Sequence, residues 1–173
     1  LKNFIENEDI KIKFITYKNG RVYFSSNESN WGEIKSFDLL NRKDEIQVIP
    51  QVYNHLLLNE YFTDNYIICK YKTLGKNYLM VYDYSGTFIK KIDVPNGNNI
   101  DFSFLDDQTK DLYFEVYSYT MPYQNFKINL ETGIHKRFYK KDSEPKPIIF
   151  TLDHFETKII TYKNKDGIEV PIT

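Results

Sequence analysis

A repeat of about 45 residues is the feature that most limits how this chain can fold. Three segments each contain an alternating apolar run, a polar turn and a second alternating run: residues 20–39, 64–84 and 110–130. Matching positions of the first run are 44 and 46 residues apart: Tyr23, Ile67 and Tyr113. Positions that end the second run are 45 and 46 residues apart: Asp38, Asp83 and Asn129. Two anchors thus give the same period, which suits a four-stranded propeller blade.

Two more strands complete each repeat. An inner strand is expected before each pair, at residues 11–16, 56–62 and 99–105. An outer strand is expected after each pair, at residues 45–49, 87–94 and 134–139. Gly-containing turns separate the strands. Pro50 and Pro95 end two of the outer strands. Proline has no backbone N–H, and this is tolerated best in an edge strand, which has a neighbour on one side only.

The sequence therefore predicts an all-β fold, a partial β-propeller of about three four-stranded antiparallel blades followed by a C-terminal β-hairpin. The predicted propeller covers residues 1–141, with blades at about 9–50, 51–95 and 97–141. A generic antiparallel sandwich also has short strands and regular turns, but the common period favours a propeller. Three blades do not close a ring, so we expect that further blades or a second copy cover the terminal sheets, or that the chain is poorly stable alone.

The repeat stops after residue 139. The charged, proline-containing stretch KKDSEPKP begins at residue 140, and residues 142–154 are predicted to be a linker. Two short apolar runs follow, at residues 155–163 and 167–173, and the sequence NKDG between them predicts a hairpin turn. A lone hairpin is marginally stable in water. We therefore expect residues 155–173 to begin another domain.

Composition supports strands and argues against charged partners. Aromatic residues make up 17% of the 173 residues, and alanine is absent, which favours pleated sheets over helices. The formal net charge of −1 gives no indication of a nucleic-acid or membrane partner. The one cysteine, Cys69, cannot form an internal disulfide. This fits a reducing compartment, and we expect a cytoplasmic location.

Residue types with known chemistry do not form a recognisable site. The glycines stand at 20, 32, 75, 86, 97, 133 and 167, and no two are four apart, so a Gly-x-Ser-x-Gly nucleophile elbow does not exist here. His55, His135 and His154 lack metal-ligand spacing, and there are no paired cysteines. We therefore predict no catalytic, cofactor-binding or metal-binding residues, and no cofactor.

Two groups of residues and Cys69 have a structural and a functional interpretation. The acidic group comprises Asp106, Asp107, Asp111 and Glu115. It is predicted to be solvated turn charge rather than a glycosidase-type pair, which needs two carboxylates across a cleft. Cys69 lies in the alternating run YIICKY and is predicted to be a small buried side chain rather than a reactive thiol.

The aromatic loops comprise Trp31-Gly32 in the first repeat and Tyr119, Met121, Pro122 and Tyr123 in the third. We expect them to pack between blades rather than form an exposed contact surface.

Two stretches carry a resemblance to a known family. In YSYTMPYQNFKINLETG, residues 117–133, the matching positions are Ser118, Tyr119, Pro122, Leu130, Thr132 and Gly133, with Asn129 where the family has Asp. In LDHFETKIITYKNKDGIEVPI, residues 152–172, they are Phe155, Glu156, Asp166, Gly167, Val170 and Pro171, with Asn164 where Ser is usual. The chain in this respect resembles prolyl oligopeptidases and their oligopeptidase B relatives.

The resemblance implies a serine peptidase context. In that family a seven-bladed propeller precedes most of an α/β-hydrolase domain, and the active site lies in the cavity between them. The chain would supply the last blades and, at residues 155–173, the start of the hydrolase domain. Its partners would be the remaining blades, the hydrolase domain and, through the complete enzyme, short peptides. The resemblance does not decide whether the complete enzyme would cleave after proline or after basic residues.

Because the Ser/Asp/His triad is missing, we expect the chain to be inactive by itself. Its expected role is to gate the access of short peptides to an active site carried elsewhere. The alternative is a non-enzymatic propeller module that binds protein or glycan ligands through its loops.

Overall fold

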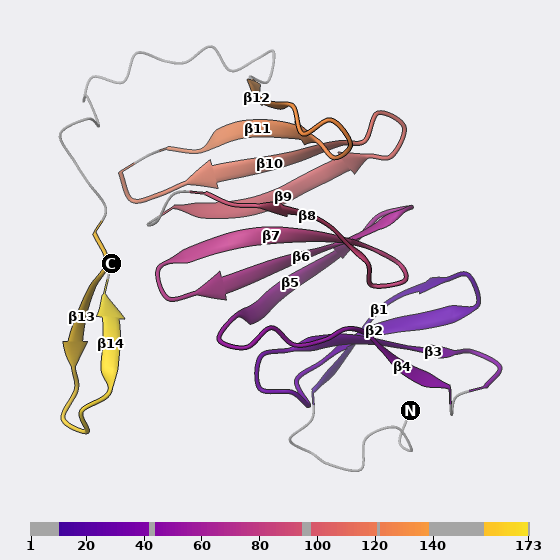
Figure 1. Cartoon of the computed structure of the whole chain (residues 1–173), viewed down its shortest axis with the longest axis horizontal. Helices are drawn as coiled ribbons and strands as arrows, with labels where there is room; N and C mark the ends of the chain where they lie inside the picture. Colours follow the sequence, from indigo (N-terminus) through magenta and orange to yellow (C-terminus); the bar gives the residue numbers. More distant parts are fainter. Residues whose placement is uncertain (1–10, 42–43, 95–97, 121, 139–157, 173) are drawn as a thin grey trace.

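The computed structural model describes residues 11–41, 44–94, 98–120, 122–138 and 158–172. These residues form β-strands joined by short turns (Figure 1). Among them there is no helix of the length and apolarity needed to cross a membrane.

Three antiparallel sheets of four strands follow the three repeats. The first blade consists of β1 (Ile12–Lys18), β2 (Arg21–Ser26), β3 (Glu33–Asp38) and β4 (Glu45–Ile49). The second consists of β5 (Leu56–Phe62), β6 (Tyr66–Thr73), β7 (Lys76–Asp83) and β8 (Phe88–Ile92). The third consists of β9 (Asn99–Asp106), β10 (Asp111–Tyr117), β11 (Gln124–Asn129) and β12 (His135–Phe138). Each sheet keeps its strands in chain order, so the predicted inner and outer strands are confirmed.

The C-terminal strands form a sheet of their own. β13 (Ile160–Lys163) pairs with β14 (Glu169–Ile172) and with no blade. Asn164 and Gly167 close the turn, in which the Gly167 N–H donates to the Asn164 carbonyl at 3.0 Å. The predicted hairpin is therefore confirmed over these residues, while the predicted linker at 142–154 lies outside the described ones.

The three blades succeed one another, with the second between the other two (Figure 1). Strand β6 shows why: successive side chains of a strand point to opposite faces, and both faces of this strand are buried. Ile67 and Cys69 belong to the core shared with the first blade, whereas Ile68 belongs to the core shared with the third. This arrangement is that of a partial propeller and not of a two-sheet sandwich.

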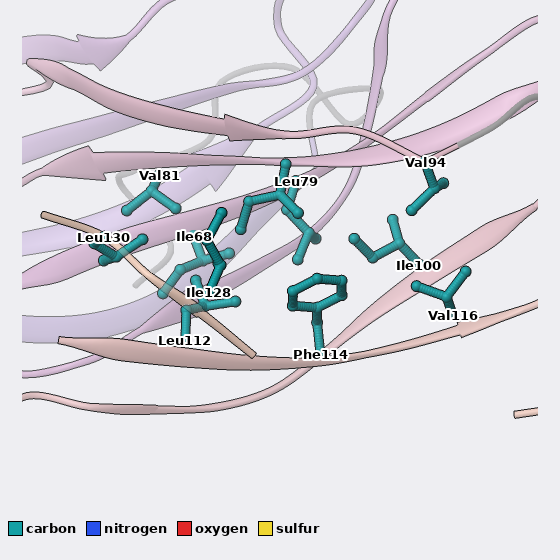
Figure 2. Packing of buried hydrophobic residues seen from close by; sticks show 11 residues of the cluster. Ile68, Leu79, Val81, Val94, Ile100, Leu112, Phe114, Val116, Ile128 and Leu130 are labelled. Atoms are coloured by element: carbon teal, nitrogen blue, oxygen red, sulfur yellow. The ribbon is translucent and has the colours of Figure 1, made fainter. Parts of the chain in front are cut away.

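A cluster of buried hydrophobic side chains lies between the second and third blades. Figure 2 shows Ile68 and Leu79 of the second blade near Ile100, Leu112 and Phe114 of the third. All five are fully or almost fully buried. Each such side chain contributes about 1.5–3 kcal/mol when it leaves water, so this interface alone makes the two blades one packed unit.

Hydrogen bonds and an ion pair also link neighbouring blades and fix how they align. The Leu57 N–H donates to the Trp31 carbonyl at 2.8 Å, and the Tyr23 hydroxyl donates to the Tyr84 carbonyl at 3.3 Å. Between the second and third blades, Lys70 pairs with Asp101. Trp31 and Tyr84 lie in turns, whereas Lys70 and Asp101 lie on β6 and β9, so both turns and strands contribute to these contacts.

The repeated Asp/Asn anchor has a local explanation. Asp38, Asp83 and Asn129 end the third strand of each blade, and each side-chain oxygen accepts backbone N–H groups of the turn that follows. For Asp83 the donors are the N–H groups of Ser85 at 2.8 Å and Thr87 at 2.9 Å. Short Asx side chains make such turns readily, so the period seen in the sequence marks the turn into each outer strand.

Candidate functional site

One candidate site is a cavity of about 1000 Å³ at one end of the blades. Turns and strand ends of all three blades supply most of its walls, and Ile168 and Glu169 of the C-terminal hairpin supply the remainder. In Figure 1 the hairpin lies beside the end of the second blade that carries the β6–β7 turn. The cavity therefore lies between the blades and the segment predicted to begin the next domain.

The β6–β7 turn brings the hairpin to the second blade. Gly75 in this turn has a φ of 95°, which L side chains rarely adopt. A Cβ atom on Gly75 would lie 2.3 Å from Cδ1 of Ile159, just before β13. The glycine thus serves two purposes, because it permits the tight turn and leaves room for the apolar contact.

Lys72 and Asn77 face one another across the β6–β7 pair and both line the cavity. Asn77 is 8% exposed, and its Nδ2 donates to Oδ1 of Asn99 at 2.6 Å. Its Oδ1 atom has no hydrogen-bond partner in the part of the chain that the structure describes. An unpaired buried acceptor costs roughly 1–3 kcal/mol, and nothing in the sequence singled out this asparagine.

His55 is held at the same end of the second blade. Its Nδ1 atom and the Tyr78 hydroxyl form a hydrogen bond of 2.5 Å, and the two rings meet edge to face. Burial, with smaller contributions from Tyr82 and Asp93, raises the pKa of Tyr78 to about 12. The phenol therefore stays protonated at neutral pH. It positions the imidazole and does not act as a nucleophile.

Cys69 has the structural role that its alternating strand predicts. Its side chain is fully buried in the core between the first two blades. Burial raises the pKa of the Cys69 thiol well above its ordinary value. A thiol that is both inaccessible and protonated is not a nucleophile.

The described histidines do not approach a metal site. His135 is exposed on β12 and stacks on Phe114 and Phe126, with ring centroids 5.7 and 5.2 Å away. His135 therefore lies on the outer strand of the third blade, while His154 lies outside the described residues. Within the described ranges no group of three His, Cys, Asp or Glu side chains could hold a metal ion.

Of the acidic group, Asp106 and Asp107 lie at the predicted turn, whereas Asp111 and Glu115 lie on β10 and not in a turn. Asp106 accepts N–H groups of its own turn, and Asp111 pairs with Lys127 at 2.5 Å. Asp107 instead accepts the Asp64 N–H at 3.1 Å and the Asn65 Nδ2 at 2.8 Å. Asp107 thus lies in the turn as predicted, and its carboxylate also joins the second and third blades.

The residues of the aromatic loops differ in whether they pack between blades. Trp31 packs between blades as predicted: its ring meets that of Tyr53 edge to face with centroids 6.0 Å apart. Tyr119 and Tyr123 are 84% and 64% exposed, so the prediction of packing between blades is wrong for them. The Tyr123 ring stacks on the Tyr117 ring of the same blade, with the ring centroids 4.3 Å apart. Pro122 is exposed, and Met121 lies outside the described residues.

Comparison with known proteins gives matches at the level of structure. No family model and no curated protein matches the sequence. A solved structure from a study of two prolyl endopeptidases superposes with a TM-score of 0.81 at 19% identity. The chain has a prolyl oligopeptidase-like fold. The match covers 96% of this chain and 24% of that one.

Related peptidases from other organisms superpose in the same way. Prolyl oligopeptidase B from Galerina marginata gives a TM-score of 0.78 at 17% identity, over 95% of this chain and 23% of that one. Oligopeptidase B from Trypanosoma brucei gives 0.75 at 12% identity, over 95% and 25%. The prolyl oligopeptidase-like chain thus spans about a quarter of their length.

Proposed function

We propose that this chain is the non-catalytic propeller part of a prolyl oligopeptidase-like serine peptidase. Its blades would wall a cavity and admit short peptides to an active site carried by a hydrolase domain. The proposed division is a propeller at residues 1–141, a linker at 142–154 and the start of the hydrolase domain at 155–173. The partners are the remaining blades and that domain, and the predicted location is the cytoplasm.

The observation that supports this proposal best is the placement of the C-terminal hairpin. β13 and β14 pair only with one another within the described residues, and the third blade already has its outer strand in β12. A binding module that used its last residues as an extra blade strand would pair them with β12. The hairpin instead closes one wall of the cavity, where an adjoining domain would begin.

The chemistry of the described residues agrees with a role in access rather than in bond cleavage. The sequence has no Gly-x-Ser-x-Gly elbow. The thiol of Cys69 is buried, and the phenol of Tyr78 is held protonated. A nucleophile of the family type would therefore come from another part of the peptidase.

Two experiments test this proposal. The reading frame that surrounds this sequence should encode a Gly-x-Ser-x-Gly elbow downstream of Thr173, and a downstream sequence without one would contradict the proposal. The 173-residue chain should also leave chromogenic peptides with proline or arginine before the leaving group uncleaved. Turnover above a buffer blank would show that the chain itself is catalytic.

A further inference from the structure

The cavity beside the hairpin contains an imidazole whose orientation is fixed by a buried partner. His55 lines this cavity, and its Nδ1 atom forms the 2.5 Å hydrogen bond with the Tyr78 hydroxyl. A bond from the His55 backbone N–H to the Val52 carbonyl, at 3.0 Å, closes the turn that carries the ring. Because Nδ1 is used by the blade, Nε2 is the ring nitrogen left for a ligand in the cavity.

Tyr78 decides which of the two ring nitrogens carries the proton. Its side chain is 2% exposed, and within the described ranges its hydroxyl has no acceptor other than His55. If this hydroxyl accepted a bond from Nδ1–H, its own proton would be buried without an acceptor, which is unfavourable. A neutral imidazole that accepts a hydrogen bond at Nδ1 carries its proton on Nε2. The buried phenol thus gives the cavity an N–H donor at His55 Nε2.

Asn99 supplies a second oriented donor from the third blade. It lines the same cavity, and its Oδ1 accepts the Nδ2 of Asn77 at 2.6 Å. The Nδ2 of Asn99 is therefore the end of this amide that is left for a ligand. The apolar side chains of Leu74 and Ile168 also line the cavity. Neutral N–H donors beside apolar side chains suit a peptide, whose main chain has a carbonyl acceptor at every residue.

We propose that His55 recognises a main-chain carbonyl oxygen of an extended peptide in this cavity. Its Nε2–H donates to that oxygen, Asn99 Nδ2 donates to a second carbonyl, and Tyr78 is the residue that positions the imidazole. The cavity volume of about 1000 Å³ is large enough for a short peptide segment. This inference rests on the proposed function and adds to it the groups by which the propeller contacts a peptide main chain.

The first test determines the tautomer of His55 in the 173-residue chain. Nitrogen NMR shifts separate a protonated ring nitrogen from an unprotonated one, at a pH where titration of the signals shows a neutral ring. We expect Nε2–H in the unmodified chain and a mixture of both tautomers in Y78F. Y82F is the matched control, because it removes another buried hydroxyl of β7, which bonds to Met80 instead, and it should keep Nε2–H. An Nδ1–H ring in the unmodified chain, or the same tautomer population in Y78F, would overturn the inference.

The second test adds the neutral peptide acetyl-Ala-Gly-Pro-Gly-Ala-amide, which has carbonyl oxygens and no carboxylate. At millimolar peptide the side-chain signals of His55 and Asn99 should shift, whereas those of His135, which does not line this cavity, should not. Unmoved His55 signals, or equal shifts of His55 and His135, would contradict the site.

Two variants measure the contribution of the donor to binding. H55F keeps an aromatic ring beside Tyr78 but has no N–H, and it should bind the peptide about fivefold more weakly, the effect of one hydrogen bond. H135F should bind as the unmodified chain does. Equal affinities of H55F and H135F would contradict the inference, and the tautomer and peptide shifts of the unmodified chain decide it even if a variant folds poorly. A downstream Gly-x-Ser-x-Gly elbow would leave the proposed function intact whichever result the peptide gives.

Discussion

Gly86 lies so close to the carbonyl oxygen of Val48 that a Cβ atom on Gly86 would be 2.0 Å from it. Gly86 is in the turn between β7 and β8 of the second blade, and Val48 is on β4, the outer strand of the first. The contact is backbone against backbone, so no side-chain rotation can relieve it. The spacing of these two blades therefore depends on a missing side chain.

The first prediction concerns this contact. The substitution G86A should force the first two blades apart as well as strain a backbone with φ of 85°. Gly20 is the matched control, since its φ is 81° and no atom would lie within 4 Å of its Cβ. We expect G20A to cost about 1–2 kcal/mol of unfolding free energy from the strained backbone, and G86A about 1–3 kcal/mol more from the overpacked interface. Urea denaturation measures both, and equal losses would show that the blades do not meet here.

The second prediction concerns Asn129, which stands where the resembled family has Asp. Its Oδ1 accepts the turn N–H groups, while its Nδ2 donates to the Thr109 carbonyl at 2.7 Å and to Asp111 Oδ1 at 3.0 Å. An aspartate keeps the first role but turns the second into repulsion between two carboxylates. We expect N129D to lose roughly 1–3 kcal/mol of stability at pH 7.

The pH dependence of N129D gives its control. Repulsion raises the pKa of the carboxylate pair in the folded state. The protonated pair is therefore tolerated at low pH, and stability falls as the pH rises through that raised pKa. N164D is the matched variant, because Asn164 Oδ1 accepts the N–H groups of Asp166 and Ile168, which a carboxylate also does. A loss at pH 7 as large in N164D as in N129D would contradict this account.

The third prediction concerns stability in acid. Hydrogen bonds from the backbone N–H groups of Thr109 and Gln108 hold the pKa of Asp106 below its ordinary value. A carboxylate with a lowered folded pKa stabilises the protein above its unfolded pKa, and this contribution is lost as the pH falls through the folded pKa. D106N keeps the oxygen acceptor but cannot titrate. Its unfolding free energy should depend less on pH below about pH 4 than that of the unmodified chain, and an unchanged acid slope would argue against this role.

The fourth prediction concerns the contact that joins the hairpin to the second blade. In G75A the new methyl group would meet Ile159, which must then move away. We expect the NMR signals of Ile159 and Ile168 to shift. In G167A, whose Cβ would have no neighbour within 4 Å, only signals near the hairpin turn should change. Unmoved Ile159 signals in G75A would show that the hairpin does not rest on this turn.

Much of the fold follows from the sequence because its signals are local. Alternating side chains and Asx turns set the strands, and the predicted bounds of β4 and β5 coincide with those in the structure. The role of Asp107 could not be predicted in this way. Its partners Asp64 and Asn65 are 43 and 42 residues away, and only the stacking of blades brings them together.

The candidate site was harder to predict than the fold. The absence of a nucleophile elbow is visible in the residue inventory, but the cavity is built from turns of three blades and a hairpin. Asn77 lies in an ordinary alternating strand, and its unpaired oxygen depends on the neighbouring Asn99 of another blade. Tyr119 resembles Trp31 in sequence position, yet only Trp31 meets a following blade.

The successive stacking of the blades is most directly tested by a methyl-resolved NOESY spectrum of the chain. Neighbouring residues on β6 should report opposite faces of the middle blade. Ile67 methyl groups should show contacts to the first blade, at Ile34 or Tyr23, and Ile68 methyl groups to the third, at Leu112 or Phe114. Contacts of both isoleucines to the same blade, or direct contacts between the first and third blades, would contradict the propeller arrangement.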